Sequence, residues 1–164
     1  MKFRDAVIDD LADIVAIYNS TIPSRMVTAD TEPISVESRR EWFYKHTPDK
    51  RPLWIVEDYS SIVGWVGFHS FVGRPAYNGT AEISVYLHEQ ARGKGYGTQI
   101  LAYSISRCKE LGITNLLAII FSHNEPSLKL FRKFGFQDWG HLPNVASLDG
   151  VERSVSILGK RIDK

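Results

Sequence analysis

The sequence predicts a mixed α/β fold in one domain, and three observations lead to that prediction. The chain has 164 residues, enough for one domain with its own buried core. Hydrophobic residues make up 43% and charged residues 24% of the chain, as in ordinary globular proteins. Strand-like and helix-like patterns follow one another in the order β-α-α-β-β-β-α-β-α-β-β, which is typical of one mixed sheet flanked by helices. We therefore expect residues 1–164 to form a single domain.

The first half of the chain is expected to supply four strands and two helices. The strands cover residues 3–7, 53–58, 62–72 and 81–87. Asp9 or Asp10 can cap the first helix, which presents these apolar residues at helical spacing: Leu11, Ile14, Val15 and Tyr18. Ser35 is a candidate N-cap of the second helix, which should end near His46. Residues 21–35 contain two prolines and little periodicity, which favours a loop.

The second half of the chain begins from a strand with strict alternation. One face of that strand carries Ala81, Ile83, Val85 and Leu87, and the other carries Glu82, Ser84 and Tyr86. A helix follows, with Gly112 as its stop and an apolar stripe of Leu101, Ile105, Cys108 and Leu111. Residues 114–121 are almost wholly apolar, as expected of a strand covered on both faces. The remaining elements are a helix at 125–134 and strands at 135–142 and 153–162.

Charge, hydropathy and cysteine content exclude several classes of protein. The formal net charge is +1, so nothing in the overall charge points to nucleic acid. Residues 1–11 lack the apolar segment of a signal peptide, and the longest apolar run, 116–121, is too short to cross a bilayer. Cys108 is the only cysteine, which excludes an intrachain disulfide and fits a reducing compartment. We expect a cytoplasmic protein that binds neither nucleic acid nor a membrane.

A glycine-rich loop, Arg92-Gly93-Lys94-Gly95-Tyr96-Gly97, connects the alternating strand to the next helix. Glycines let a backbone approach a ligand closely, and the N–H groups at a helix start attract anions. A dinucleotide fingerprint would need a third glycine where Thr98 stands, and no Lys-Ser or Lys-Thr pair completes a Walker A loop. Spacing alone leaves two interpretations open: a diphosphate site, or a strand-to-helix turn with solvated cations.

Three segments together resemble the GCN5-related N-acetyltransferase (GNAT) superfamily. "QARGKGYG" at 90–97 matches its acetyl-CoA loop, "VYL" at 85–87 precedes that loop, and "NEPSLKLFRKFGF" at 124–136 looks like a downstream family segment. "AIYNSTI", "DTEP" and "GRPAY" extend the resemblance to the phosphinothricin and methionine sulfone/sulfoximine N-acetyltransferase group. The resemblance implies a splayed mixed sheet, acetyl-CoA between its fourth and fifth strands, and a homodimer.

The resemblance also implies which residues hold the cofactor. They are Val85, Leu87, Arg92, Gly93, Lys94, Gly95, Tyr96, Gly97, Thr98, Asn124 and Ser127. The Val85 N–H would bond the thioester carbonyl, although its side chain also suits ordinary apolar packing. Asn124 would contact the pantetheine arm, but asparagine is equally a favoured helix N-cap. Ser127 would lie near the CoA phosphates.

Amide formation from a thioester needs a base for the amine and a route for the leaving thiolate. Glu82 matches the glutamate base of the resembling group; the alternative is an exposed residue of an alternating strand. Phe131 stands where many members carry tyrosine, so their proton donor cannot be transferred. Tyr86 is a possible substitute, and a thiol with a pKa of roughly 8 to 9 can also leave unassisted. Arg74 and Tyr77 are candidates for binding a substrate carboxylate, or else are solvated loop residues.

The predicted function is transfer of an acetyl group from acetyl-CoA to the primary amine of a small acceptor. The acceptor is expected to be of the phosphinothricin, methionine sulfone or methionine sulfoximine type, attacking directly in a ternary complex. Two alternatives remain open: a non-catalytic acyl-CoA-binding module, and a protein or peptide N-terminal acetyltransferase. No metal is expected, since His88 and His123 lack metal-ligand spacing.

Overall fold

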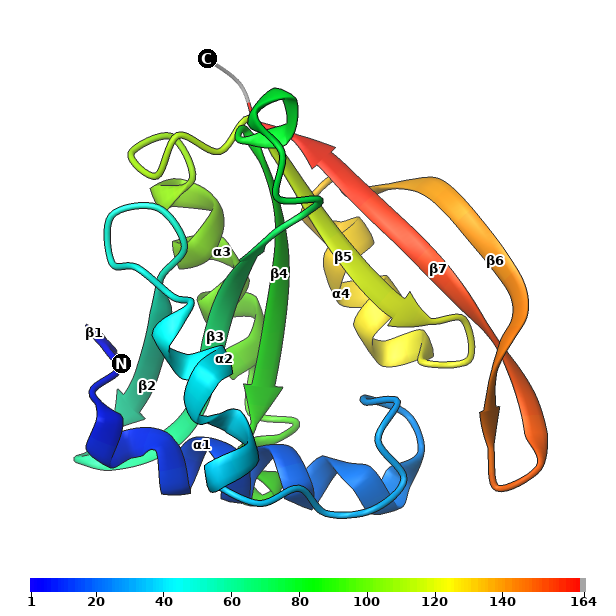
Figure 1. Ribbon diagram of the computed structural model, residues 1–164, viewed down its shortest axis with the longest axis horizontal. Helices are drawn as coiled ribbons and strands as arrows, with labels where there is room; N and C mark the ends of the chain where they lie inside the picture. The colour runs from blue at the N-terminus through cyan, green and yellow to red at the C-terminus, as the bar shows by residue number, and fades with distance from the viewer. Residues whose placement is uncertain (163–164) are drawn as a thin grey trace.

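The computed structural model describes residues 1–162, whose strands form one sheet in the order β1-β2-β3-β4-β5-β7-β6 (Figure 1). The strands are β1 (Lys2–Asp5), β2 (Leu53–Asp58), β3 (Ser61–Ser70), β4 (Thr80–Leu87), β5 (Asn115–Phe121), β6 (Gln137–Leu148) and β7 (Val151–Arg161). Neighbouring strands are antiparallel except β4 and β5, which run parallel. The predicted mixed α/β sheet and the order of its elements are confirmed.

Helices cover both faces of the sheet. They are α1 (Leu11–Thr21), α2 (Arg40–Tyr44), α3 (Tyr96–Arg107) and α4 (Glu125–Lys133). Trp54 and Ile55 are neighbours on β2, so they point to opposite faces, and they belong to different buried clusters. The Trp54 cluster includes apolar side chains of α3 and α4, and the Ile55 cluster includes those of α1 and α2. The two helix pairs therefore pack on opposite faces (Figure 1).

The parallel pairing of β4 with β5 is short. It joins Thr80 with Asn115, Ala81 with Leu116 and Glu82 with Leu117, and it does not continue beyond Glu82. From that point the two strands spread apart toward α1 (Figure 1). The sequence predicts 114–121 as covered on both faces, which is wrong at Thr114, an exposed residue before β5 begins, and at Ile119, which is 48% exposed beyond the split.

The sixth strand is longer than the sequence predicts. The sequence predicts this strand at 135–142, just before Pro143 and Asn144, two residue types common in turns. In the structure the register shifts between Leu142 and Ala146, and pairing with β7 resumes at Ala146. Asn144 has φ +51°, so the turn-forming residues produce an irregularity within β6, and pairing with β7 continues beyond it.

Two predictions near the start of the chain are also wrong. β1 ends at Asp5 rather than at Val7, and the Asp10 side chain does not cap α1. Asp10 closes a short 3-10 turn in a helical conformation, with φ −78° and ψ −12°. Its carboxylate accepts the Val7 N–H at 2.8 Å and two hydrogen bonds from Arg4 at 2.7 and 2.9 Å. Asp10 thus ties α1 to the sheet edge instead of to its own helix.

Replacing Asp10 by alanine should lower the free energy of unfolding at pH 7 by about 2 kcal/mol, because three hydrogen bonds to a buried carboxylate are lost. Arg4 holds the pKa of the Asp10 carboxyl below its usual value. The stabilisation is therefore present above the ordinary aspartate pKa of about 3.9 and disappears as the pH falls through the lowered folded value.

Urea unfolding of wild type and Asp10→Ala, at neutral and at acidic pH, measures both effects. Asp13→Ala is the control, because Asp13 is exposed in the first turn of the same helix. An equal loss of stability in the two variants would contradict the role of Asp10.

Candidate active site

The space between the separating strands β4 and β5 is a cavity of about 510 Å³, called the splay cleft below. Its walls come from the end of β4, the second half of β5, the glycine loop and the start of α4. The predicted cofactor-binding residues that line it are Val85, Leu87, Arg92, Gly93, Gly95, Gly97, Thr98, Asn124 and Ser127. Lys94 and Tyr96 do not line it. The fold therefore brings motifs far apart in the sequence to one cleft.

The glycine loop owes its shape to two residues in the left-handed backbone region. Gly93 has φ +72° and Gly95, which precedes α3, has φ +79°. Other L-residues are strained there, so glycine is required by conformation rather than by crowding. The loop leads directly into the first turn of α3. The N–H groups of that turn have no hydrogen-bond partners within the helix. These N–H groups could hold an anion at the part of the splay cleft that Gly93, Gly95 and Gly97 line.

Tyr96 anchors this loop from outside the cleft. Its hydroxyl donates to the Asp58 carboxylate at 2.6 Å, and this bond holds the pKa of Asp58 below its usual value. Asp58 is the last residue of β2, so the bond ties the start of α3 to the end of that strand. The side chain of Tyr96 therefore positions the loop and does not face the cavity.

Asn124 has two partners at the start of α4. Its Oδ1 accepts the Ser127 N–H at 3.3 Å, which confirms the N-cap interpretation, and its Nδ2 donates to the Met26 carbonyl at 3.0 Å. Met26 and Val27 lie in the loop after α1 and line the same cleft. Asn124 thus fastens that loop over the splay cleft.

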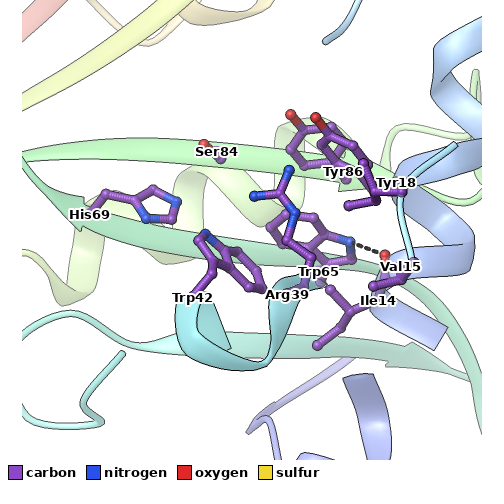
Figure 2. A pocket seen from close by; sticks show the side chains of 10 residues that line it. Ile14, Val15, Tyr18, Arg39, Trp42, Trp65, His69, Ser84 and Tyr86 are labelled. Atoms are coloured by element: carbon purple, nitrogen blue, oxygen red, sulfur yellow. Dashed lines mark hydrogen bonds between the residues drawn. The ribbon is translucent and has the colours of Figure 1, made fainter. Parts of the chain in front are cut away.

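A second cavity, of about 190 Å³, lies on the α1 and α2 face of the sheet (Figure 2). We call it the aromatic pocket. Its lining consists of Ile14, Val15, Tyr18, Ile34, Arg39, Trp42, Trp65, His69, Ser84 and Tyr86. Trp65 stacks on Tyr86 at 4.5 Å between ring centroids, and Trp42 meets Trp65 edge-on at 5.5 Å. Stacked and edge-on aromatic rings, carried by the sheet and by helices α1 and α2, thus form most of the pocket wall.

Ser84 and Tyr86 line both cavities, so β4 is the wall that the splay cleft and the aromatic pocket share. Glu82 lies two residues before Ser84, at the last paired position before the strands separate. Burial raises the pKa of the Glu82 carboxyl, and no hydrogen-bond partner of its side chain lies within residues 1–162. His69 lies opposite Glu82 on β3. Glu82 is therefore the next residue along the face of β4 that carries Ser84 and Tyr86, but its side chain lines neither cavity.

Sequence reasoning missed four residues of the aromatic pocket, namely Arg39, Trp42, Trp65 and His69. Two had a signal, because Trp65 and His69 alternate along β3 and lie opposite Tyr86 and Glu82. Placing them on that face requires the strand register, which the sequence does not state. Trp42 of α2 both packs in the Ile55 cluster and lines the pocket.

Arg74 and Tyr77, the sequence-based candidates for a substrate carboxylate, lie in the loop between β3 and β4. Both are exposed, Tyr77 packs against Phe71 at 5.7 Å between ring centroids, and neither lines a cavity. The described chain does not bring them to the candidate site.

Phe131 and Tyr86 both line the splay cleft, but they differ in whether they can donate a proton. Phe131 is buried, packs edge-on against Phe136 at 5.0 Å, and has no proton to donate. Burial raises the pKa of the Tyr86 hydroxyl, so this group stays protonated at neutral pH. Of these two cleft residues, only Tyr86 carries an exchangeable proton.

Residues 1–162 hold no group of three or more His, Cys, Asp or Glu side chains placed to bind a metal ion. No helix in this part of the chain has the length and apolar character needed to cross a membrane.

The acetyltransferase (GNAT) domain family matches residues 1–137 of this chain. The chain belongs to the GNAT acetyltransferase family. A Bacillus subtilis (strain 168) protein named "Putative phosphinothricin acetyltransferase YwnH" is 51% identical over 163 residues, covering 99% of both chains. The L-methionine sulfoximine/L-methionine sulfone acetyltransferase of Pseudomonas aeruginosa is 31% identical, covering 99% of this chain and 95% of its own.

A related solved structure contains acetyl-CoA. The phosphinothricin acetyltransferase of Sinorhizobium meliloti, in complex with acetyl-CoA, has a TM-score of 0.90 and 27% identity, covering 98% of this chain and 88% of its own. The resemblance predicted from the glycine loop and its flanking motifs is confirmed. This GNAT protein is an N-acetyltransferase whose acyl donor is acetyl-CoA.

Gly95→Ala should weaken acetyl-CoA binding about tenfold, because an L-residue at φ +79° costs roughly 1–2 kcal/mol and reshapes the loop. Calorimetric titration with acetyl-CoA measures the dissociation constant. Gly150→Ala is a matched control, since Gly150 has φ +78° in the turn between β6 and β7, away from both cavities. If the two variants bind acetyl-CoA equally well, the loop does not hold the cofactor.

Proposed function

We propose that the protein transfers the acetyl group of acetyl-CoA to the primary amine of a small amino-acid-like acceptor. Phosphinothricin, methionine sulfone and methionine sulfoximine are the acceptors that the names of its relatives suggest. One observation carries the proposal: two cavities share a wall at Ser84 and Tyr86, so a donor and an acceptor have separate places side by side. The amine then attacks the thioester directly, without an acyl-enzyme.

The splay cleft is proposed to hold acetyl-CoA, with its diphosphate at the glycine loop. Beyond Glu82, β4 has no strand partner on its β5 side among the described residues, so that edge is free to bond an extended ligand such as pantetheine. The Val85 N–H is proposed to stabilise the oxyanion that develops on the thioester carbonyl. Val85 lines the cleft in the middle of this free segment, which supports the assignment.

Glu82 is proposed as the base that takes the proton from the attacking amine. Because it lines neither cavity, we propose that it acts through a water molecule near Ser84. Burial raises the pKa of its carboxyl, which makes Glu82 a stronger base than an exposed glutamate. After attack, the tetrahedral intermediate expels the CoA thiolate, which takes a proton from Tyr86 or from water. The position of Tyr86 on the shared wall supports the first donor, although the raised pKa of its hydroxyl makes it a weaker acid than an exposed tyrosine.

The size of the aromatic pocket favours a free amino acid over a peptide acceptor. Its 190 Å³ lies below the range of about 300–1,000 Å³ that holds drug-sized ligands. Helices α1 and α2 and the sheet supply its walls, and its small volume leaves a peptide little room beyond its first residue.

Assembly, location and domain extent complete the proposal. We propose a cytoplasmic homodimer; support comes from the edge strand β6, which exposes Trp139, Leu142 and Val145. We also propose that residues 1–164 act as one domain, because β6 and β7, which extend past the matched family segment, complete the same sheet. Residues 163 and 164 lie outside the described part of the chain.

Glu82→Gln should lower kcat by about 100-fold or more while acetyl-CoA affinity stays nearly unchanged, because only the base is lost. In the wild type, kcat should fall as the pH drops through the raised pKa of Glu82, and this acid limb should be absent in the variant. Thiol release from acetyl-CoA, measured across pH with methionine sulfone as acceptor, tests both points.

The control variant is Glu152→Gln, which changes an exposed glutamate on β7. Unchanged turnover in Glu82→Gln would remove Glu82 from the mechanism. Binding of acetyl-CoA without turnover of any amine by the wild type would favour the non-catalytic alternative instead.

A further inference from the structure

The aromatic pocket carries one formal charge, on Arg39. The other lining residues are apolar, aromatic or hydroxyl-bearing, apart from His69. Burial, the nearby His46 and Arg39 lower the pKa of His69 to about 4, so its ring is neutral at neutral pH. The pocket is therefore a small aromatic cavity with a single positive charge in its wall.

The Arg39 side chain packs against two aromatic rings. Its guanidinium carbon lies 5.0 Å from the centre of the Tyr18 ring and 5.7 Å from that of the Trp42 ring. Stacking by the flat face of the guanidinium leaves its N–H edge free to bond another group. Figure 2 shows Arg39 rising from beside Trp42, with its guanidinium pointing toward β4 between Ser84 and Tyr86.

Within residues 1–162, the only acid that Arg39 contacts is Asp30, through one long bond of 3.4 Å. The same Asp30 oxygen also accepts the Tyr18 hydroxyl, so its charge is shared. Arg4 and Arg25, by contrast, each bond both oxygens of one carboxylate, at 2.7 to 3.2 Å. Arg39 thus keeps most of its five N–H donors without a partner in the described chain.

We propose that Arg39 binds the α-carboxylate of the acceptor and so selects amino acids over simple amines. The proposal rests on the acceptor assignment made above. A planar guanidinium bonds both oxygens of a carboxylate, a geometry that fixes orientation as well as affinity. The α-amine is one carbon away from that carboxylate, so an acceptor bound to Arg39 places its amine near Ser84, on the wall shared with the splay cleft.

The sequence offers a different candidate for binding the carboxylate, Arg74. Arg74 lies in an exposed loop and lines neither cavity. Arg40 offers a neutral comparison, because it neighbours Arg39 in the chain, is exposed, and pairs with Glu37 without lining a cavity. The three arginines therefore give a matched set of variants.

The test compares two acceptors that differ only at the carboxylate, methionine sulfone and its carboxamide. Wild type should prefer the acid, and Arg39→Met should raise the KM for the acid about tenfold or more while the KM for the carboxamide stays nearly unchanged. Arg39→Lys should fall between the two, because it keeps the charge but loses the planar fork. Arg40→Met and Arg74→Met should retain the wild-type preference for the acid.

Three outcomes would overturn the role of Arg39: equal losses on both acceptors in Arg39→Met, loss of the acid preference in Arg74→Met instead, or no acid preference in the wild type. Thermal melting of each variant shows whether packing on Tyr18 and Trp42 is disturbed, and Arg39→Lys still reports on the carboxylate if Arg39→Met unfolds.

Calorimetric titration of methionine sulfone into the CoA-bound protein separates this proposal from the proposed function. If the wild type acetylates no acceptor, the proposed function fails. Binding of the acid that is lost in Arg39→Met and kept in Arg40→Met would still support the role of Arg39, and binding insensitive to Arg39 would overturn it.

Discussion

The early end of the parallel pairing between β4 and β5 is the constraint on which the rest of the site depends. Only Thr80, Ala81 and Glu82 pair across this boundary. Because the pairing stops there, the splay cleft opens, an edge of β4 becomes free for a ligand, and Glu82 stands where the opening begins. A regular sheet would bury the same side chains and leave no room for a cofactor.

The same strand separates two environments that suit two substrates. On one side, the glycine loop, the start of α3 and Arg92 form the part of the splay cleft that is proposed to hold the polyanionic cofactor. On the other, aromatic rings enclose a small pocket with one arginine. Burial there raises the pKa of Glu82 and Tyr86 and lowers that of His69, so the groups near the reaction are uncharged or readily accept a proton. Low polarity around Glu82 thus strengthens it as a base, which is what its proposed role requires, whereas Tyr86 is proposed as a donor on its position alone.

Local patterns in the sequence predict several of the elements that form the site. The alternation of 81–87 predicts the polar strip of β4, and the glycine spacing predicts the loop that precedes α3. These features depend on residues close together in the chain, where periodicity and backbone preference act. The cleft residues from α4 follow from the family resemblance, not from periodicity.

Other features depend on contacts between distant segments, which local patterns do not encode. The exposure of Ile119 results from the separation of β4 and β5, and the extension of β6 past Pro143 results from pairing with β7. Arg39 has no sequence signal, because its position over Tyr18 and Trp42 follows from packing of α1 against α2. Arg74 is a candidate for the same task because an arginine fork fits a carboxylate, but the sequence does not show that its loop lies away from the cavities.

The central claim is that donor and acceptor occupy the protein together on either side of β4. Initial rates measured over a matrix of acetyl-CoA and methionine sulfone concentrations test it most directly. A ternary complex predicts double-reciprocal lines that intersect, and no release of CoA when the acceptor is omitted. Parallel lines, with a burst of CoA release before acceptor is added, would show an acyl-enzyme and contradict the account.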